Sequence, residues 1–262
     1  PASIYDIKTG VVAIGANVSI PGAIVTAVGR NGFFIQVDPA STGYTGPDNS
    51  GLFVYTGAAP TALRGDVVNV VSATVTDFFG QKELTTPMLE TASSGATVPP
   101  AVEVTASEIV TGGSRAAALE GVLVHLGSST VSDIAPAPGT GDSAPTNKFV
   151  IDSGLRVDDF LYLIEPFPSV GENFAGLTGV VAFRNGANKL LPRDVDDVVP
   201  GSASIASFGP ALSYIRTLGV GMTFPMPLTV TLTRPAGPGG VEITLTSSDV
   251  GLLVSNLTIA EG

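Results

Sequence analysis

The chain contains no cysteine and a single histidine, His125. The absence of cysteine excludes disulfide bonds, thiolate metal ligands and cysteine nucleophiles. One histidine excludes any metal site that needs two histidine ligands, and no Gly-x-Ser-x-Gly elbow accompanies it to support a serine hydrolase triad. We therefore expect a structural or surface role for His125 and no enzymatic activity from this chain, although a catalytic domain could lie outside it.

Charged residues are also scarce, at 13% of the chain against roughly 25% in ordinary soluble domains. The 12 basic and 23 acidic residues give a net charge of −11, whereas nucleic-acid binding normally needs a basic patch. Nucleic acid is thus a disfavoured partner. No apolar run reaches the roughly 18 residues of a membrane span. The low lysine content, with abundant alanine, glycine, threonine, valine and serine, is typical of an exported protein that is extracellular or on the cell surface.

Glycine and proline are abundant, at 32 and 20 residues in a chain of 262. Many short strands separated by glycine and proline turns explain this composition better than long helices do. The sequence predicts an all-β protein with two or three small domains. The first strands are expected at 17–28, 32–38, 51–55, 67–78 and 82–85, with a hairpin turn at Asn31–Gly32 and an edge strand or a tether at 4–7. A linker is expected at 91–100, and a short helix is expected to open within 104–109, with Thr105 or Ser107 as its cap.

The segment from about residue 119 repeats the order of motifs seen in the first hundred residues. Five stretches correspond in sequence order, which favours two copies of one fold. The second copy carries an insertion, 135–145, in place of the first hairpin turn. The corresponding stretches are 20–25 and 119–124, 34–38 and 148–152, 51–54 and 154–157, 63–66 and 169–172, and 80–84 and 186–190.

The last segment differs from both copies. Residues 228–233 and 241–246 alternate polar and apolar side chains, and further strands are expected at 253–254 and 257–259. This pattern predicts the first strands of a β-sandwich, but the segment is shorter than the roughly 100 residues of a complete one. Either the natural chain continues beyond Gly262, which is the default, or a strand from another molecule completes the sheet.

The glycine-led strands Gly22–Thr26, Gly32–Gln36, Gly51–Tyr55 and Gly65–Val68 resemble the OB-fold-like domain of large secreted bacterial nucleases and related cell-surface proteins. Residues 177–194 resemble the companion domain of those proteins, and 228–261 resemble bacterial immunoglobulin-like repeats. The resemblance implies two OB-like barrels, at 1–98 and 101–200, and a partial immunoglobulin-like segment at 208–262. It also implies an accessory segment, because the catalytic constellation of those nucleases has no counterpart here.

One set of candidate site residues is aromatic and basic. OB-fold barrels bind single strands by stacking bases on exposed aromatic rings, and strand alternation places about half of the rings in the core instead. We expect Phe34 to be exposed, near Arg30, Arg64 and Lys82, and these four are the nucleic-acid contact candidates. Packing in the core or against another domain is the alternative for the aromatic residues. The six aromatic residues of the first copy are Phe33, Phe34, Phe53, Tyr55, Phe78 and Phe79.

The other set is acidic and lies in loops, where carboxylate and carbonyl oxygens suit Ca²⁺. No cofactor is expected otherwise. None of the acidic clusters has the spacing of a known calcium loop, so solvated turns and strand ends are the alternative. A third cluster, Asp152, Asp158 and Asp159, flanks a strand of the second copy. The calcium candidates are Asp38, Asp48, Asn49, Asp194, Asp196 and Asp197.

Two functions remain open from the sequence. The first is a non-catalytic extracellular β-domain array that serves as a structural, assembly or adhesive segment, in its sharpest form a filament subunit joined by strand complementation. Its partners would be other copies of itself or neighbouring domains of a longer polypeptide. The second is a nucleic-acid-binding accessory segment of a secreted nuclease, which the resemblance favours and the net charge opposes.

Overall fold

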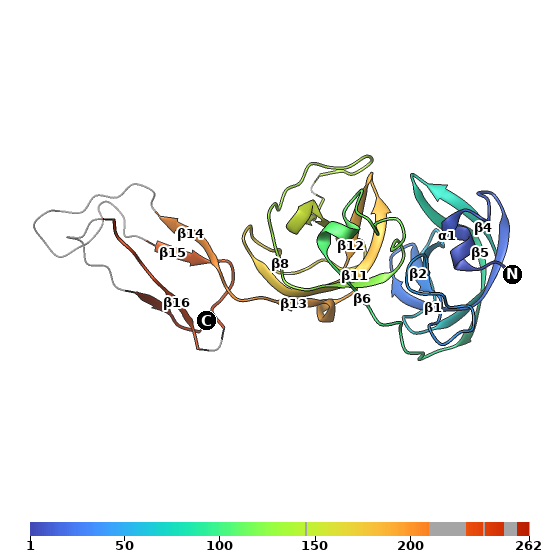
Figure 1. Ribbon diagram of the computed structural model, residues 1–262, viewed down its shortest axis with the longest axis horizontal. Coiled ribbons are helices and arrows are strands. Elements are labelled where there is room, and N and C mark those ends of the chain that lie inside the picture. Colours follow the sequence, from blue (N-terminus) through green and yellow to red (C-terminus); the bar gives the residue numbers. More distant parts are fainter. Residues whose placement is uncertain (145, 210–228, 238, 249–255, 262) are drawn as a thin grey trace, which may run out of the picture.

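The chain is built mainly of β-strands in three parts that lie in a row (Figure 1). The structure is a computed structural model that describes residues 1–144, 146–209, 229–237, 239–248 and 256–261. Within those ranges the α-helices are two short ones, α1 (Ile4–Thr9) and α2 (Ala106–Ile109). The prediction of an all-β protein is therefore confirmed.

The expected edge strand at residues 4–7 is instead helix α1. Ser3 caps this helix, since its side chain accepts a hydrogen bond from the Asp6 amide, and Gly10 ends it in the left-handed conformation. Ile4 and Ile7 lie three residues apart, so both point into the core. Four residues are too few to separate a helical from a strand period, which is why the sequence misled here.

The first five strands form a closed barrel, which we call the first barrel. The strands are β1 (Asn17–Val28), β2 (Gly32–Gln36), β3 (Gly51–Tyr55), β4 (Val67–Phe78) and β5 (Gln81–Ser93). Their order around the barrel is β1-β2-β3-β5-β4, and β3 and β5 are parallel while the other pairs are antiparallel. The hairpin expected at Asn31–Gly32 joins β1 to β2, closed by a bond from the Gly29 amide to the Gly32 carbonyl.

Side chains on β2 alternate between two different apolar environments. Phe33 and Ile35 point into the barrel, in a core with residues of β1, β3, β4 and α1. Phe34 points outward, but it is fully buried. The outer face of this strand is therefore covered by another part of the chain, as described below.

The second part is a sheet of eight strands, which we call the second sheet. Its main path is β6-β7-β11-β12-β10-β9, and β8 and β13 pair with β11 beside it. Strands β10 and β12 are parallel, as β3 and β5 are in the first barrel. The strands are β6 (Val102–Val104), β7 (Leu123–Leu126), β8 (Ser129–Thr130), β9 (Phe149–Val150), β10 (Arg156–Val157), β11 (Asn173–Arg184), β12 (Ala187–Leu191) and β13 (Val198–Pro200).

Short helical segments complete the second sheet. Helix α2 begins after Thr105, so Thr105 rather than Ser107 is the cap, and Glu108 accepts a hydrogen bond from the Thr105 backbone amide. Two 3₁₀ turns, η1 (Asp152–Gly154) and η2 (Val195–Asp197), follow β9 and β12. The linker expected at 91–100 begins later than predicted, because Thr91 and Ser93 still pair with β4.

Among the residues described after 200, the third part contains two separate two-stranded sheets. Strand β14 (Ile205–Gly209) pairs with β15 (Thr229–Leu232), and β16 (Val241–Ile243) pairs with β17 (Leu257–Ile259). Strands are present in three of the expected stretches, while the one expected at 253–254 lies outside the described residues. No helix in the described part of the chain is both long and apolar enough to cross a membrane.

Candidate functional site

The outer face of the first barrel is packed against the second sheet. The two parts share an apolar cluster, which we call the junction cluster, with Phe160 and Leu161 packed at its margin. The rings of Phe34 and Phe53 lie 4.8 Å apart in a tilted arrangement, and Phe160 meets Phe53 edge to face at 6.0 Å. The buried members of the junction cluster are Ala27, Phe34, Phe53, Leu123, Val180, Ala182 and Leu191.

The prediction that Phe34 is exposed is therefore wrong. The alternation along β2 does place Phe34 on the opposite face from Phe33. That face meets the second sheet rather than water, so the Phe34 ring cannot stack on a base. Of the six aromatic residues, Tyr55, Phe78 and Phe79 are the exposed ones.

Two glycines let the backbones of the two parts touch. A Cβ on Gly51, at the start of β3, would lie 2.2 Å from the carbonyl carbon of Gly121. A Cβ on Gly121 would lie 2.5 Å from the backbone of Gly51 and Leu52, and Gly121 also has φ +84°. No side chain fits at either position without separating the two backbone segments.

Polar contacts surround the junction cluster. The best-buried one is a bond of 2.8 Å from the Leu123 amide to Oε1 of Gln36, and Gln36 is itself buried. Lys8 of α1 forms an ion pair of 3.1 Å with Glu120, in which both side chains are nearly inaccessible to water. The pairs that join the two parts are Gln36 with Leu123, Asn49 with Ala118, Asp48 with Arg115, Lys8 with Glu120, Gln81 with Phe183, Thr26 with Arg193 and Arg64 with Asp194.

The basic residues expected to gather near Phe34 do not form a binding surface with it. Arg64 forms an exposed ion pair with Asp194 across the junction. Lys82 donates to the backbone carbonyl of Lys8 at 2.8 Å. Arg30 is exposed in the β1–β2 turn. Phe34 is buried beneath the second sheet, so the four candidates do not make the predicted nucleic-acid contact surface.

The acidic candidates of the first loop serve local structure in this arrangement. Asp38 accepts a hydrogen bond from the Ala40 amide at 2.8 Å. Asp48 pairs with Arg115 of the second sheet. Asn49 has φ 64°, and its backbone N–H donates to the Ala118 carbonyl at 2.6 Å, so Asn49 belongs to the junction.

The acidic candidates after β12 are likewise engaged by protein groups. Both carboxylate oxygens of Asp197 accept bonds from Arg193, at 2.7 and 2.8 Å. Asp194 caps η2 through the Asp196 amide and pairs with Arg64, while Asp196 is exposed. Among the described residues, no group of three or more acidic, histidine or cysteine side chains is arranged to hold a metal ion.

His125 lies on β7, on the same face as Leu123, as the alternation predicts. Its Nδ1 lies 3.0 Å from the hydroxyl oxygen of Thr178 on the paired strand β11. This contact joins two neighbouring strands and agrees with the structural role expected for His125.

Four largely buried charged side chains of the second part, Asp142, Lys148, Asp158 and Lys189, form a network that we call the buried network. Asp158 accepts from Lys189 at 2.9 Å and lies 3.3 Å from Lys148, which contacts Asp142 at 2.6 Å. Burial lowers the pKa of Lys189 to about 8, although Asp158 opposes the shift. Each lysine has a carboxylate partner, and the network ties the insertion that contains Asp142 to β9, β10 and β12. From the sequence, Asp158 belonged to an acidic cluster considered for Ca²⁺, and its contacts with two lysines were not predicted.

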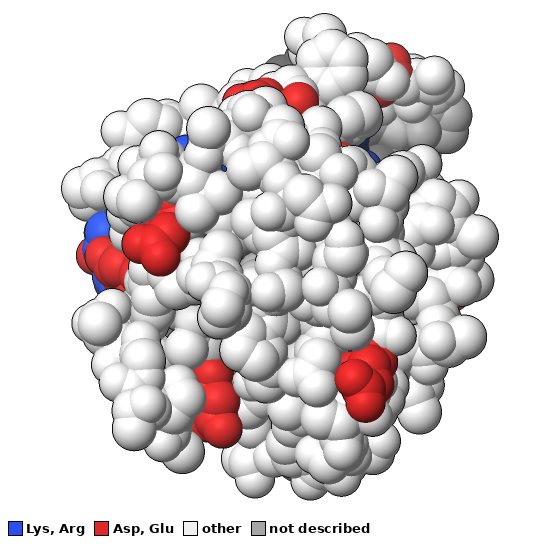
Figure 2. Space-filling model, turned by 90° about the vertical axis from the view of Figure 1, so that its right-hand side faces the viewer, with Lys and Arg blue, Asp and Glu red and all other residues white. Residues whose placement is uncertain are grey.

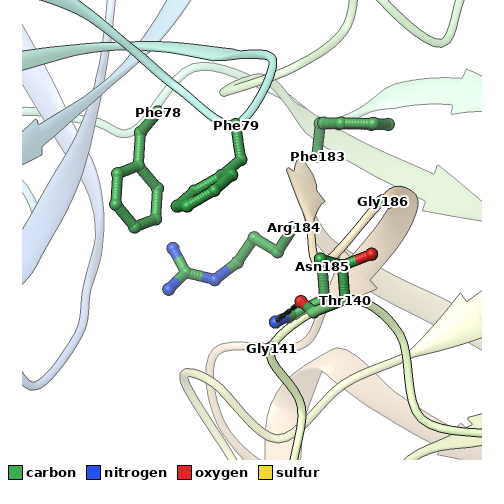
Figure 3. A pocket seen from close by; sticks show the side chains of 8 residues that line it. All are labelled: Phe78, Phe79, Thr140, Gly141, Phe183, Arg184, Asn185 and Gly186. Atoms are coloured by element: carbon green, nitrogen blue, oxygen red, sulfur yellow. Dashed lines mark hydrogen bonds between the residues drawn. The ribbon is translucent and has the colours of Figure 1, made fainter.

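A cavity of about 210 Å³ opens beside the junction cluster, between the β4–β5 turn and the β11–β12 turn (Figure 3). Phe78 and Phe79 form one wall, with centroids 4.9 Å apart and exposed fractions of 49% and 76%. Figure 3 shows the Arg184 side chain extended toward these two rings. The other residues that line the cavity are Thr140, Gly141, Phe183, Asn185 and Gly186.

The Arg184 guanidinium stacks on the ring of Phe160, with its carbon atom 4.0 Å from the ring centroid. Among the described residues, no carboxylate oxygen lies within 4.0 Å of its nitrogens. Burial lowers the pKa of Arg184, while the more distant charges of Asp158, Glu83 and Asp142 oppose that shift. The side chain is thus a half-buried cation without an ion-pair partner in the described part of the chain.

Hydrogen bonds fix the walls of the cavity. The Phe183 amide donates to Gln81 at 3.1 Å, and a Cβ on Gly80 would lie 2.9 Å from the Phe183 ring. On the other side, Asn185 donates to the Thr140 carbonyl at 3.0 Å and receives a bond of 2.9 Å from Lys189. The cavity is therefore supported by both the junction and the buried network.

Sequence reasoning picked out Phe78 and Phe79 but missed Arg184, Phe183 and Phe160. The repeat contains a usable signal, since it aligns the turn after Phe79 with the turn after Arg184. It does not reveal that the two turns face each other, because that depends on how the two parts dock.

No protein-family model matches this chain, and no curated protein matches it. The function is therefore inferred from the junction, the buried network and the cavity.

Proposed function

We propose that the chain is a non-catalytic β-domain array that serves as a structural, assembly or adhesive segment of a secreted or cell-surface bacterial protein. In this proposal, residues 1–98 are an OB-like barrel and 208–262 are part of an immunoglobulin-like domain. Residues 101–200 are a second OB-like copy, but its sheet is open rather than the closed barrel expected from the sequence. The first two parts act together as one rigid spacer. The observation that carries the proposal is the junction cluster, which buries Phe34, Phe53 and Leu191 between the first two parts.

The junction supports a rigid spacer better than a flexible tether. Domains that move independently share small, polar contacts, whereas a large apolar contact fixes their orientation. Here the apolar contact includes the close backbone approach of Gly51 and Gly121, and it is surrounded by hydrogen bonds and ion pairs.

The third part contacts the second sheet through hydrogen bonds from Arg234. Arg234 donates to Glu172 at 2.6 Å and to the carbonyls of Asn173 and Gly201 at 2.9 and 3.1 Å. Ile205 and Phe208 on β14 are about half exposed. We propose that this part meets neighbouring domains or other copies of the chain, and strand complementation into a filament is the sharpest form of that proposal.

The alternative, a nucleic-acid-binding accessory segment, gains no support from the geometry. Its candidate ring is buried, and Arg64 and Lys82 are engaged by other groups. Figure 2 shows the end face of the first barrel, which carries scattered acidic side chains and little basic surface. Such a face repels a phosphate backbone.

A distance measurement across the junction tests the spacer. Because the chain has no cysteine, Glu90→Cys and Ala175→Cys place two unique spin labels on exposed positions of β5 and β11. Pulsed electron paramagnetic resonance should give one narrow distance distribution, and adding Phe34→Ala should broaden it. Spectra of the two single-cysteine variants control for motion of the labels. A broad distribution in the otherwise unaltered chain would show that the parts move independently and would rule out a rigid spacer.

A further inference from the structure

We propose that the cavity between the β4–β5 and β11–β12 turns is a binding site for a small ligand that carries one aromatic ring and one carboxylate. The aromatic pair Phe78 and Phe79 would take the ring, and Arg184 would take the carboxylate. This site goes beyond the structural role proposed above, and Phe78, Phe79 and Arg184 are not members of the junction cluster.

The cation provides the first argument. A guanidinium presents five N–H donors in a planar fork that matches a carboxylate, and it normally finds an acceptor when it is withdrawn from water. Arg184 stacks one face on Phe160 and has no carboxylate within 4.0 Å in the described part of the chain. An incoming carboxylate would supply the missing acceptors with two parallel hydrogen bonds.

The aromatic wall provides the second argument. Phe79 is 76% exposed and has φ 50°, a backbone conformation that a bulky residue rarely adopts. Its ring stands edge to face against Phe78 rather than in a core. Two exposed rings beside a cation offer an apolar surface on which a flat ring can stack.

Size and charge limit the ligand. The cavity of about 210 Å³ is smaller than the roughly 300–1,000 Å³ of sites for drug-sized molecules, so it suits one ring with a short substituent. A polyanion would be repelled by the net charge of −11, whereas a single carboxylate requires only the local field of Arg184. Both a free aromatic acid and an aromatic residue at a peptide C-terminus have this chemistry.

The experiment titrates the full chain with N-acetylphenylalanine and with N-acetylphenylalaninamide, which lacks the carboxylate. Chemical shifts of backbone amides report binding, and we expect a Kd on the order of 1 mM for the acid, in keeping with its size. The amide should bind at least about tenfold more weakly. Equal binding of acid and amide, or shifts that lie away from the two turns, would overturn the proposal.

Variants separate binding from folding. Arg184→Gln should weaken binding of the acid about tenfold or more and leave binding of the amide nearly unchanged. Because Arg184 also packs on Phe160, Phe79→Ala provides an independent test at an exposed position, and it should weaken binding of both probes several-fold. Phe208→Ala is the matched control, since Phe208 is a 55% exposed ring in the third part. Unchanged acid binding in Phe79→Ala would contradict the proposal.

A third probe identifies the source of the ligand. An acetylated Gly-Gly-Ser-Phe peptide carries the same ring and carboxylate at a chain end. Binding as tight as that of N-acetylphenylalanine supports recognition of a peptide C-terminus, whereas clearly weaker binding supports recognition of a free acid. Both results support the aromatic carboxylate, and they differ only in where it comes from.

Discussion

The first barrel and the second sheet place corresponding strands in the same order but hold them together differently. In the first barrel, β1 and β2 pair directly through a tight turn, so backbone hydrogen bonds close the ring of strands. In the second sheet, the long insertion separates β7 from β9, and the sheet path ends at β9 without returning to β7. There the insertion is anchored by the buried Lys148, Lys189, Asp142 and Asp158.

This difference shows how one strand pattern tolerates a long insertion. A short hairpin satisfies its own backbone groups, whereas a long loop needs side chains to hold it in place. Buried ion pairs can do this only when each charge has a partner, because an unpaired buried charge is costly. The second copy therefore depends on a few polar residues where the first depends on backbone pairing.

The largest effect is expected from breaking the buried network. Asp158→Ala leaves both Lys148 and Lys189 without their shared partner, and the free energy of unfolding should fall by about 3–5 kcal/mol. Urea denaturation measures this loss. Arg64→Ala is the control, because it removes an exposed ion pair and should cost at most about 1 kcal/mol. Equal losses in the two variants would mean that the network does not anchor the insertion.

The next effect concerns the contact between the two parts. Gly51→Ala places a methyl group against the backbone of Gly121, and the strain should destabilise the chain by about 2–3 kcal/mol. The variant should also broaden the distance distribution between labels on β5 and β11. Gly43→Ala is the matched control, since nothing lies within 4 Å of its Cβ. Wild-type stability in Gly51→Ala would show that the backbones do not need this close approach.

The smallest expected effect is a pH dependence of the free energy of unfolding that comes from Glu83 in the first barrel. Burial raises the pKa of Glu83 on β5 from 4.5 to about 7, although Arg184 opposes the shift. Between these values the folded chain keeps a proton that the unfolded chain has released, so the free energy of unfolding falls as pH rises. Glu83→Gln, which stays neutral, should remove about 1–2 kcal/mol of this fall, as measured by urea denaturation from pH 4.5 to 8.

A control for the pH series uses the same strand. Glu90→Gln changes an exposed carboxylate of β5 and should keep the pH dependence of the unaltered chain. If Glu83→Gln showed the same slope as the unaltered chain, Glu83 would not be the group that titrates near neutral pH.

Several elements could be read directly from the sequence. The alternation in 32–36, the Asn31–Gly32 turn and the helix after Thr105 are local patterns, and all three are present as expected. The repeat also aligned β2 with β9, β3 with β10 and β5 with β12. Such patterns depend on residues close in sequence, so a single chain is enough to find them.

The candidate site could not be found in the same way. The sequence predicted a contact surface around Phe34, but the outer face of β2 is covered by the second sheet. Alternation separates two faces of a strand, but it does not say whether the outer face meets water or another domain. For the same reason the sequence did not predict a site at Arg184, because its neighbours Phe160, Phe78 and Phe79 come from distant parts of the chain.

By itself, the sequence determined an all-β chain with a repeated strand order, without cysteine chemistry and without a two-histidine metal site. Composition, turn residues and periodicity are sufficient for these conclusions, because each is a property of the chain before it folds. Only the tertiary structure decided that Phe34 is a junction residue, that Asp158 joins two buried lysines, and that Arg184 faces a cavity. Those roles arise from contacts between residues far apart in sequence, and docking of the two parts creates many of them.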